Sequence, residues 1–180
     1  VLDRRAPAAF QKVFEFARPV SRFPLEALIV YDLNRDGLSE IILGGANSVL
    51  WNHGAGQFEV APFLDDTDHV FADAAILADF TNDGYVDFIG VDIARYPLLF
   101  EGNAEGRFTT TGHRIVDVTF EQPKSFTAGD VDGDGDLDLF IANYKNAYEG
   151  GQMPTPYYDA NDGHPAYLLR NDGNGNFTDM

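Results

Sequence analysis

A nine-residue acidic segment occurs three times in this chain, and it restricts the fold more than any other feature. Each copy has oxygen-bearing side chains at positions 1, 3, 5 and 9 and glycine at position 6. The copies span residues 32–40, 79–87 and 130–138, and their first aspartates lie 47 and 51 residues apart. A period of this length is typical of repeat proteins in which each copy forms one supersecondary unit.

Short apolar strings flank every copy and indicate β-strands. Each copy then continues into a strand, a turn rich in glycine and asparagine, and a strand that opens on Phe58, Phe108 or Phe177. These strings are too short and too rich in β-branched and aromatic residues for helices. Four short strands in about 50 residues match one blade of a β-propeller. The fold expected is therefore all-β, with about three four-stranded antiparallel blades.

The repeat spacing also predicts a division of the chain. Residues 1–24 form an uncertain N-terminal segment, which we interpret as the end of a preceding blade. The three blades are expected at residues 25–63, 64–112 and 113–180, and the third contains an insertion at 143–166.

The acidic loops have the composition of calcium sites. In residues 130–138, the four aspartates at positions 1, 3, 5 and 9 repel one another, and calcium relieves this because it is a hard cation that accepts 6–8 oxygen ligands. Magnesium fits less well because it requires strict octahedral geometry and retains its waters. We predict about three calcium ions, with main-chain carbonyls contributing at position 7. The ligands expected are Asp32, Asn34, Asp36, Leu38, Glu40, Asp79, Thr81, Asp83, Tyr85, Asp87, Asp130, Asp132, Asp134, Asp136 and Asp138.

Two alternatives to these sites were weighed. An EF-hand or dockerin loop requires an acidic residue at position 12 and a following helix. Position 12 is Leu43, Gly90 or Ile141, and strands are expected to follow, so this alternative is rejected. The other alternative is a solvated turn without an ion. This ion-free alternative is strongest for residues 79–87. There, Thr81 stands where the other loops have an asparagine or an aspartate, which should weaken calcium binding.

Composition narrows the function further. Twelve Lys and Arg against 29 Asp and Glu give a net charge of −17, which opposes binding to nucleic acid. The chain has no cysteine, which excludes disulfides, zinc–thiolate sites and thiol catalysis. No apolar run is long enough for a transmembrane segment. Neither a Gly-x-Ser-x-Gly nor a His-Glu-x-x-His motif is present, so we expect no catalysis.

The third repeat carries an aromatic insertion. Residues 143–166 hold four of the eight tyrosines of the chain. Aromatic loops on a rigid scaffold often form binding surfaces, and tyrosine rings also stack on sugars. The other interpretation is a loop that covers the propeller with its own side chains. The candidate binding residues are Tyr144, Tyr148, Tyr157 and Tyr158.

The acidic loops resemble the FG-GAP/VCBS repeats of integrin-type β-propellers. Residues 129–143 and 167–179 are most similar to bacterial FG-GAP proteins of the ASPIC/UnbV group, which are relatives of cartilage acidic protein. The resemblance covers about residues 27–180 and implies a ring of seven blades. Three repeats do not close such a ring, so we expect a segment of a longer propeller.

The resemblance also implies a function. It predicts a calcium-binding, non-enzymatic domain that mediates protein interaction or adhesion in an extracellular, periplasmic or cell-surface location. Its partner would be a protein or a surface glycan. Two alternatives stay open: a carbohydrate-binding or polysaccharide-lyase propeller, and a structural subunit of a larger assembly.

Overall fold

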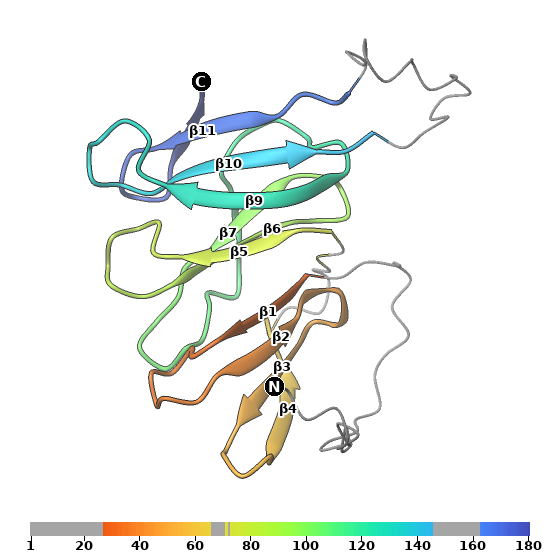
Figure 1. The fold of residues 1–180 in the computed structure, drawn as a ribbon, viewed down its shortest axis with the longest axis vertical. Coiled ribbons are helices and arrows are strands. Elements are labelled where there is room, and N and C mark those ends of the chain that lie inside the picture. The colour runs from red at the N-terminus through yellow and green to blue at the C-terminus, as the bar shows by residue number, and fades with distance from the viewer. Residues whose placement is uncertain (1–26, 66–70, 72, 146–162) are drawn as a thin grey trace, which may run out of the picture.

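The protein folds into three four-stranded antiparallel sheets, as a computed structural model of the chain shows (Figure 1). The structure describes residues 27–65, 71, 73–145 and 163–180. Within them lie a single-turn 3-10 helix, η1 (Gly44–Ala46), and no α-helix. The all-β propeller-type fold expected from the sequence is confirmed. No helix in the described part of the chain is long and apolar enough to cross a membrane.

Each sheet is an up-and-down meander in which strands adjacent in sequence pair with one another. The first sheet contains β1 (Leu28–Tyr31), β2 (Glu40–Leu43), β3 (Ser48–Asn52) and β4 (Phe58–Pro62). The second contains β5 (Ala75–Ala78), β6 (Asp87–Val91), β7 (Pro97–Phe100) and β8 (His113–Arg114). The third contains β9 (Pro123–Gly129), β10 (Asp138–Asn143), β11 (Tyr167–Asn171) and β12 (Phe177–Asp179).

The fourth strand of the second repeat differs from the sequence prediction. Phe108 makes an isolated bridge with Gly102 and does not open a strand, and β8 begins only at His113. The ring of Phe100 fills the intervening space, because a Cβ atom on Gly112 would lie 2.5 Å from its Cζ. The Gly102–Phe108 bridge is out of register with the Leu99–His113 pair, so the edge strand bulges between them. β8 pairs with β7 through Leu98–Arg114 and Leu99–His113.

The predicted division into blades at residues 25–63, 64–112 and 113–180 stays a prediction. Residues 1–24 and most of the insertion at 143–166 lie outside the described residues.

The three sheets stack face to face, and apolar side chains fill the space between them. Phe88 of β6 lies in the core between the first and second sheets together with Leu33 and Ile42 of the first. Its ring makes edge contacts with Phe63 and Phe71 at centroid distances of 4.8 and 4.9 Å. Such contacts add about 0.5–1.5 kcal/mol each to the free energy gained by burial.

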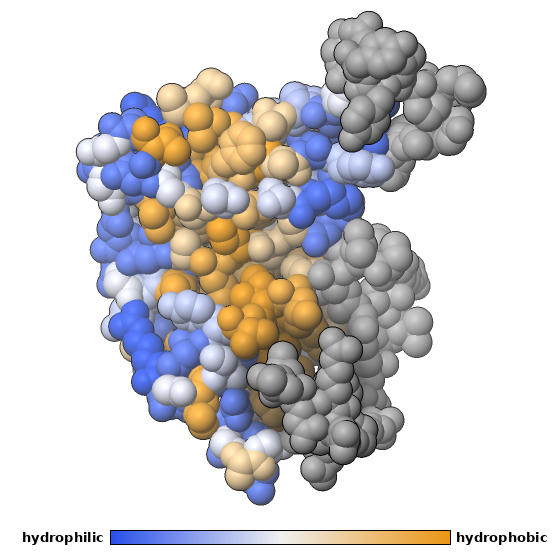
Figure 2. Space-filling view, in the orientation of Figure 1, coloured by the Kyte–Doolittle hydropathy of each residue, from blue (hydrophilic) through white to orange (hydrophobic). Residues whose placement is uncertain are grey.

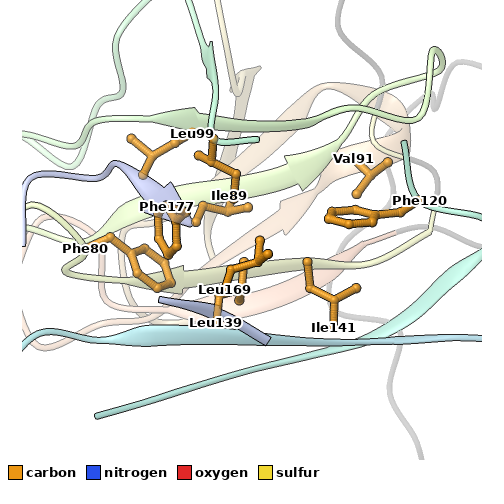
Figure 3. Packing of buried hydrophobic residues seen from close by; sticks show 10 residues of the cluster. Phe80, Ile89, Val91, Leu99, Phe120, Leu139, Ile141, Leu169 and Phe177 are labelled. Atoms are coloured by element: carbon orange, nitrogen blue, oxygen red, sulfur yellow. The ribbon is translucent and has the colours of Figure 1, made fainter. Parts of the chain in front are cut away.

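The core between the second and third sheets repeats this arrangement (Figure 3). Phe80 and Ile89 of the second sheet pack against Leu139, Leu169 and Phe177 of the third, and the first four are fully buried. Each sheet thus has two faces, which we name by positions counted from the first aspartate of its acidic loop. The trailing face carries position 2 of the loop and position 11 of the following strand. The leading face carries position 10 of that strand. At both interfaces a trailing face packs on the next sheet's leading face.

Candidate metal centre

The three acidic loops connect the first two strands of each sheet and lie along one edge of the stack (Figure 1). They are residues 32–39 between β1 and β2, 79–86 between β5 and β6, and 130–137 between β9 and β10. Hydrophilic side chains gather along this edge in the space-filling view (Figure 2). Strands and not helices follow all three loops, which agrees with the rejection of the EF-hand alternative.

The three loops share one backbone conformation. Position 6 has positive φ in each, at +88° for Gly37, +90° for Gly84 and +98° for Gly135. Position 4 has positive φ as well, in Arg35, Asn82 and Gly133. These two left-handed residues bend the loop sharply, and the carboxylate at position 1 then accepts hydrogen bonds from the loop amides. Asp79, for example, accepts from Asp83 N at 3.2 Å and Gly84 N at 2.9 Å.

This conformation gives a prediction for Gly135. We expect Gly135→Ala to lower the free energy of unfolding by about 1–2 kcal/mol, because an L-residue is strained at φ +98° although open space surrounds its Cβ. Gly129→Ala is the control: its Cβ also meets nothing within 4 Å, and its φ is not positive. Urea denaturation measures both variants. Equal stabilities would contradict the strain argument.

The carboxylates at position 9 are buried and tie each loop to its sheet. Glu40 and Asp87 are fully buried, and Asp138 is nearly so. One carboxylate oxygen of each accepts the position 2 amide, from Leu33 N at 2.8 Å, Phe80 N at 2.8 Å and Val131 N at 2.9 Å. The other oxygen accepts an amide from the end of the third strand or the turn after it, from Asn52, Gly102 and Asn171.

Burial raises the pKa of two of these carboxyl groups. Removal from water raises the pKa of Glu40 above its ordinary value, although the amides of Leu33 and Asn52 oppose the shift. Burial likewise raises the pKa of Asp87, against the hydrogen bonds from Gly102, Phe80 and Thr81. The negative charge at position 9 is therefore costly to bury. The amide network offsets part of this cost, and a nearby cation would offset more.

The third loop contains the densest group of acidic oxygens. Asp130, Asp132 and Asp138, at positions 1, 3 and 9, each place one carboxylate oxygen within 4.8 Å of the others. Asp132 is exposed, but desolvation by neighbouring protein atoms, together with the charges of Asp134 and Asp138, raises its pKa. The nearest cationic group recorded is Arg170, whose Nη1 lies 3.8 Å from Asp132 Oδ2 on a largely exposed side chain. A single, half-exposed guanidinium offsets only part of the charge of three crowded carboxylates.

The other acidic side chains of the third loop point to different partners. Asp134 Oδ1 accepts the amide of Asp136 at 3.0 Å, and Asp136 Oδ1 accepts Asn82 Nδ2 at 2.6 Å. Neither belongs to the acidic group formed by positions 1, 3 and 9. The ligand role predicted for the Asp136 carbonyl, and for those of Leu38 and Tyr85, stays a prediction.

The first and second loops do not bring three acidic residues together within the described chain. In the first, Asn34 Nδ2 donates to Asp36 Oδ2 at 3.0 Å, and Asp32 accepts the amides of Asp36 and Gly37. In the second loop, Thr81 Oγ1 donates to Asp87 Oδ2 at 3.2 Å, so the hydroxyl group of Thr81 is a hydrogen-bond donor to the buried carboxylate. The ligand sets predicted for these two loops stay predictions.

The side chains at position 4 connect neighbouring loops, which the sequence analysis did not anticipate. Arg35 donates to the carbonyl of Gly84, and its guanidinium lies 5.0 Å from the ring centroid of Tyr85. Asn82 makes the equivalent connection to Asp136 in the third loop. Position 4 differs in type among the loops, so no sequence pattern identified it.

Asn171 is a second residue that the sequence analysis missed. It is buried, and its Nδ2 donates to Phe80 O at 2.8 Å and Leu137 O at 3.2 Å, which joins the second and third loops. Asn52 occupies the same place in the first repeat and donates to Ser39 O at 3.1 Å. Asparagine at the same turn position of both repeats was the available signal.

Of the candidate binding tyrosines, the structure describes only Tyr144. Its side chain is exposed, and its amide donates to Gln122 O at 3.0 Å. Tyr148, Tyr157 and Tyr158 lie outside the described residues.

Comparison with known proteins supports the repeat assignment. A family model described as an FG-GAP-like repeat matches residues 32–90 and again residues 79–141, which together cover more than half of the chain. Each match includes two of the acidic loops. No curated protein matches the chain significantly.

Proposed function

Because this chain belongs to the FG-GAP-like repeat family and is an integrin-like β-propeller repeat domain, we propose that it binds calcium through its acidic loops and acts as a non-enzymatic interaction module. The observation that carries the proposal is the group formed by Asp130, Asp132 and Asp138. Three carboxylate oxygens within 4.8 Å of one another form a donor set of hard oxygen atoms, which calcium prefers over softer ligands.

The residues of the third loop suit a divalent cation on electrostatic grounds. Partial desolvation and repulsion from neighbouring carboxylates raise the pKa of Asp132. A bound calcium ion would supply the positive charge that removes this repulsion and would hold the loop in one conformation. Asp130 and Asp132 would bind it from the loop, and Asp138 would link it to β10.

The location and the partner form the finer part of the proposal. We propose an extracellular, periplasmic or cell-surface setting, because calcium near millimolar concentration would keep weak sites of this kind occupied. The partner proposed is a protein or a surface glycan, bound for interaction or adhesion. The ASPIC/UnbV-like strings at residues 129–143 and 167–179 favour that group within the family.

The non-enzymatic role rests on how the buried acids are used. Glu40, Asp87 and Asp138 are the buried carboxylates among the described residues, and each accepts backbone amides with both oxygens. A general acid or base needs a carboxyl group that can exchange its proton with a substrate. These three groups are committed to the fold instead.

A calcium titration followed by thermal unfolding tests the proposal. We expect calcium to raise the melting temperature, because an ion at about 100 times its Kd adds about 2.7 kcal/mol per site. Asp132→Ala should remove most of the gain contributed by the third loop. Magnesium at equal concentration should give a smaller shift, since it dehydrates reluctantly.

Asp117→Ala is the matched control for this experiment. Asp117 is an exposed aspartate whose nearest recorded partner is Arg114 at 3.8 Å, so its removal changes the net charge equally without touching a loop. It should retain the full calcium response. An identical melting temperature of the wild-type chain in calcium and in EDTA would refute calcium binding.

A further inference from the structure

A buried asparagine connects the third loop to the second sheet. Asn171 ends β11, and its amide donates to Asp138 Oδ1 at 2.9 Å. Its side-chain Nδ2 donates to two carbonyl oxygens, Leu137 O at 3.2 Å in the third loop and Phe80 O at 2.8 Å in the second. The bonds to Asp138 and Phe80 are buried, so water does not compete for them. One residue therefore contacts both the buried carboxylate of the acidic group and the neighbouring sheet.

The same chain of hydrogen bonds continues to the buried carboxylate of the second loop. Phe80, whose carbonyl accepts from Asn171, donates its own amide to Asp87 Oδ2 at 2.8 Å. Both Phe80 and Asp87 are fully buried. The position 9 carboxylates of the second and third loops, Asp87 and Asp138, are thus connected through Phe80 and Asn171. A buried network of this kind restrains the orientation of its members.

A second, exposed link joins the same two loops. Asn82, at position 4 of the second loop, donates from Nδ2 to Asp136 Oδ1 at 2.6 Å. Asp136 is position 7 of the third loop, where a main-chain carbonyl is predicted to bind calcium. Its carboxylate also lies against Gly173 in the turn after β11, because an added Cβ there would be 2.6 Å from Asp136 Oδ2. The Asp136 side chain is therefore held between Asn82 and this turn.

The other repeats have glycine at the places of these two asparagines. Gly102 stands at the place of Asn171 in the second repeat, and its amide donates to Asp87 Oδ1 at 3.0 Å without a side chain that could reach the first sheet. Gly133 stands at the place of Asn82 in the third loop, and both residues have positive φ. Glycine is therefore a substitution that this repeat already accepts at both places.

We propose that Asn171 and Asn82 are positioning residues for calcium in the third loop, so that the second sheet completes a site whose ligands belong to the third. This inference rests on the calcium binding proposed above. Neither asparagine is a ligand: Asn171 acts through Asp138, and Asn82 acts through Asp136. Loss of a partner that orients a metal ligand typically weakens metal binding about 10–100-fold. By reciprocity, calcium bound in the third loop strengthens the contact between the second and third sheets.

The test is a calorimetric calcium titration of the intact chain. The Kd of the third loop is taken from the part of the titration that Asp132→Ala abolishes. We expect Asn171→Gly to raise this Kd about 10-fold and Asn82→Gly to raise it about fivefold. Arg35→Gly is the matched control, because Arg35 has the position and the positive φ of Asn82 but donates to Gly84 O in the second loop. It should leave the Kd of the third loop unchanged.

Stability without calcium separates positioning from a purely structural role. Circular dichroism identifies the folded variants, and urea denaturation in EDTA measures their stability. A purely structural residue would lower the stability in EDTA and leave the Kd of the folded protein unchanged, and this result overturns the proposal. If Asn171→Gly does not fold, Asn82→Gly decides alone, because its side chain is exposed and its loss leaves the core intact.

The titration also distinguishes this inference from the proposed function. Calcium binding by the wild-type chain with an unchanged Kd in Asn82→Gly and Asn171→Gly overturns the positioning role alone. A wild-type chain that binds no calcium overturns both.

Discussion

Replacing Asp87 by alanine is expected to lower the free energy of unfolding by about 3 kcal/mol, even when calcium is absent. The fully buried carboxylate accepts the amides of Phe80, Thr81 and Gly102 and the hydroxyl of Thr81, at 2.8–3.2 Å. Alanine removes the acceptor and leaves these donors unpaired in the interior. Burial of the charge, which raises the pKa of Asp87, offsets part of the loss. Chemical denaturation in EDTA measures the effect.

Asp83→Ala is the matched control, because it removes an aspartate from the same loop. Asp83 Oδ1 accepts only the amide of Tyr85, at 2.8 Å, and the side chain is exposed. We expect a loss below about 1 kcal/mol. If the two variants are equally stable in EDTA, Asp87 contributes to the protein only as a ligand and the anchoring role is wrong.

Phe88→Ala should cost about 3–5 kcal/mol, the largest effect that we expect from a single substitution in the core. The ring of Phe88 is fully buried and lies within 6.2 Å, between centroids, of four other aromatic rings. Its removal leaves a cavity between the first and second sheets that the neighbouring rigid rings cannot fill. Guanidinium denaturation measures the change in stability.

Two further variants calibrate this measurement. Phe88→Leu retains much of the volume and should lose clearly less than alanine. Ile93→Ala removes an exposed apolar side chain and should change stability by less than about 0.5 kcal/mol. A loss below about 1 kcal/mol for Phe88→Ala would mean that the two sheets do not depend on this core.

Local patterns in the sequence were enough to predict the repeat unit. The acidic loops, with glycine at position 6, and the apolar strings around them led to four strands per repeat, as the sheets show. Phe58 and Phe177 open their fourth strands as expected. The prediction failed at Phe108, which makes an isolated bridge with Gly102, and the strand begins at His113, beside Gly112, against which the ring of Phe100 packs. That contact depends on packing, which a turn pattern does not contain.

The sequence predicted which loops form the candidate site and which acidic residues they carry. It did not predict which of these residues lie close together or which are buried. The sequence identified position 9 as a ligand, whereas the structure adds a second role by burying Glu40, Asp87 and Asp138 among backbone amides. Asp132 and Asp134 are equivalent candidates in the sequence; the structure brings Asp132 into the close acidic group, and the ligand role of Asp134 stays a prediction. Asp132 and Asp134 each accept the amide two residues further on, so this hydrogen bond does not distinguish them. Their different places in the folded loop do, and residue type alone does not specify those places.

By itself, the sequence determined the strand-loop-strand unit, its threefold occurrence and the oxygen-rich composition of the loops. These features follow from properties of residues that are close together in the sequence: the alternation of apolar and polar side chains, the positive φ that glycine permits and the spacing of the carboxylates. Only the tertiary structure decided which carboxylates meet, how Arg35 and Asn82 connect adjacent loops, and which apolar faces stay exposed. The contacts of Arg35 and Asn82 join residues about 50 positions apart in the chain, and the meeting of Asp130, Asp132 and Asp138 depends on the folded conformation of one loop. A pattern of residue types specifies neither.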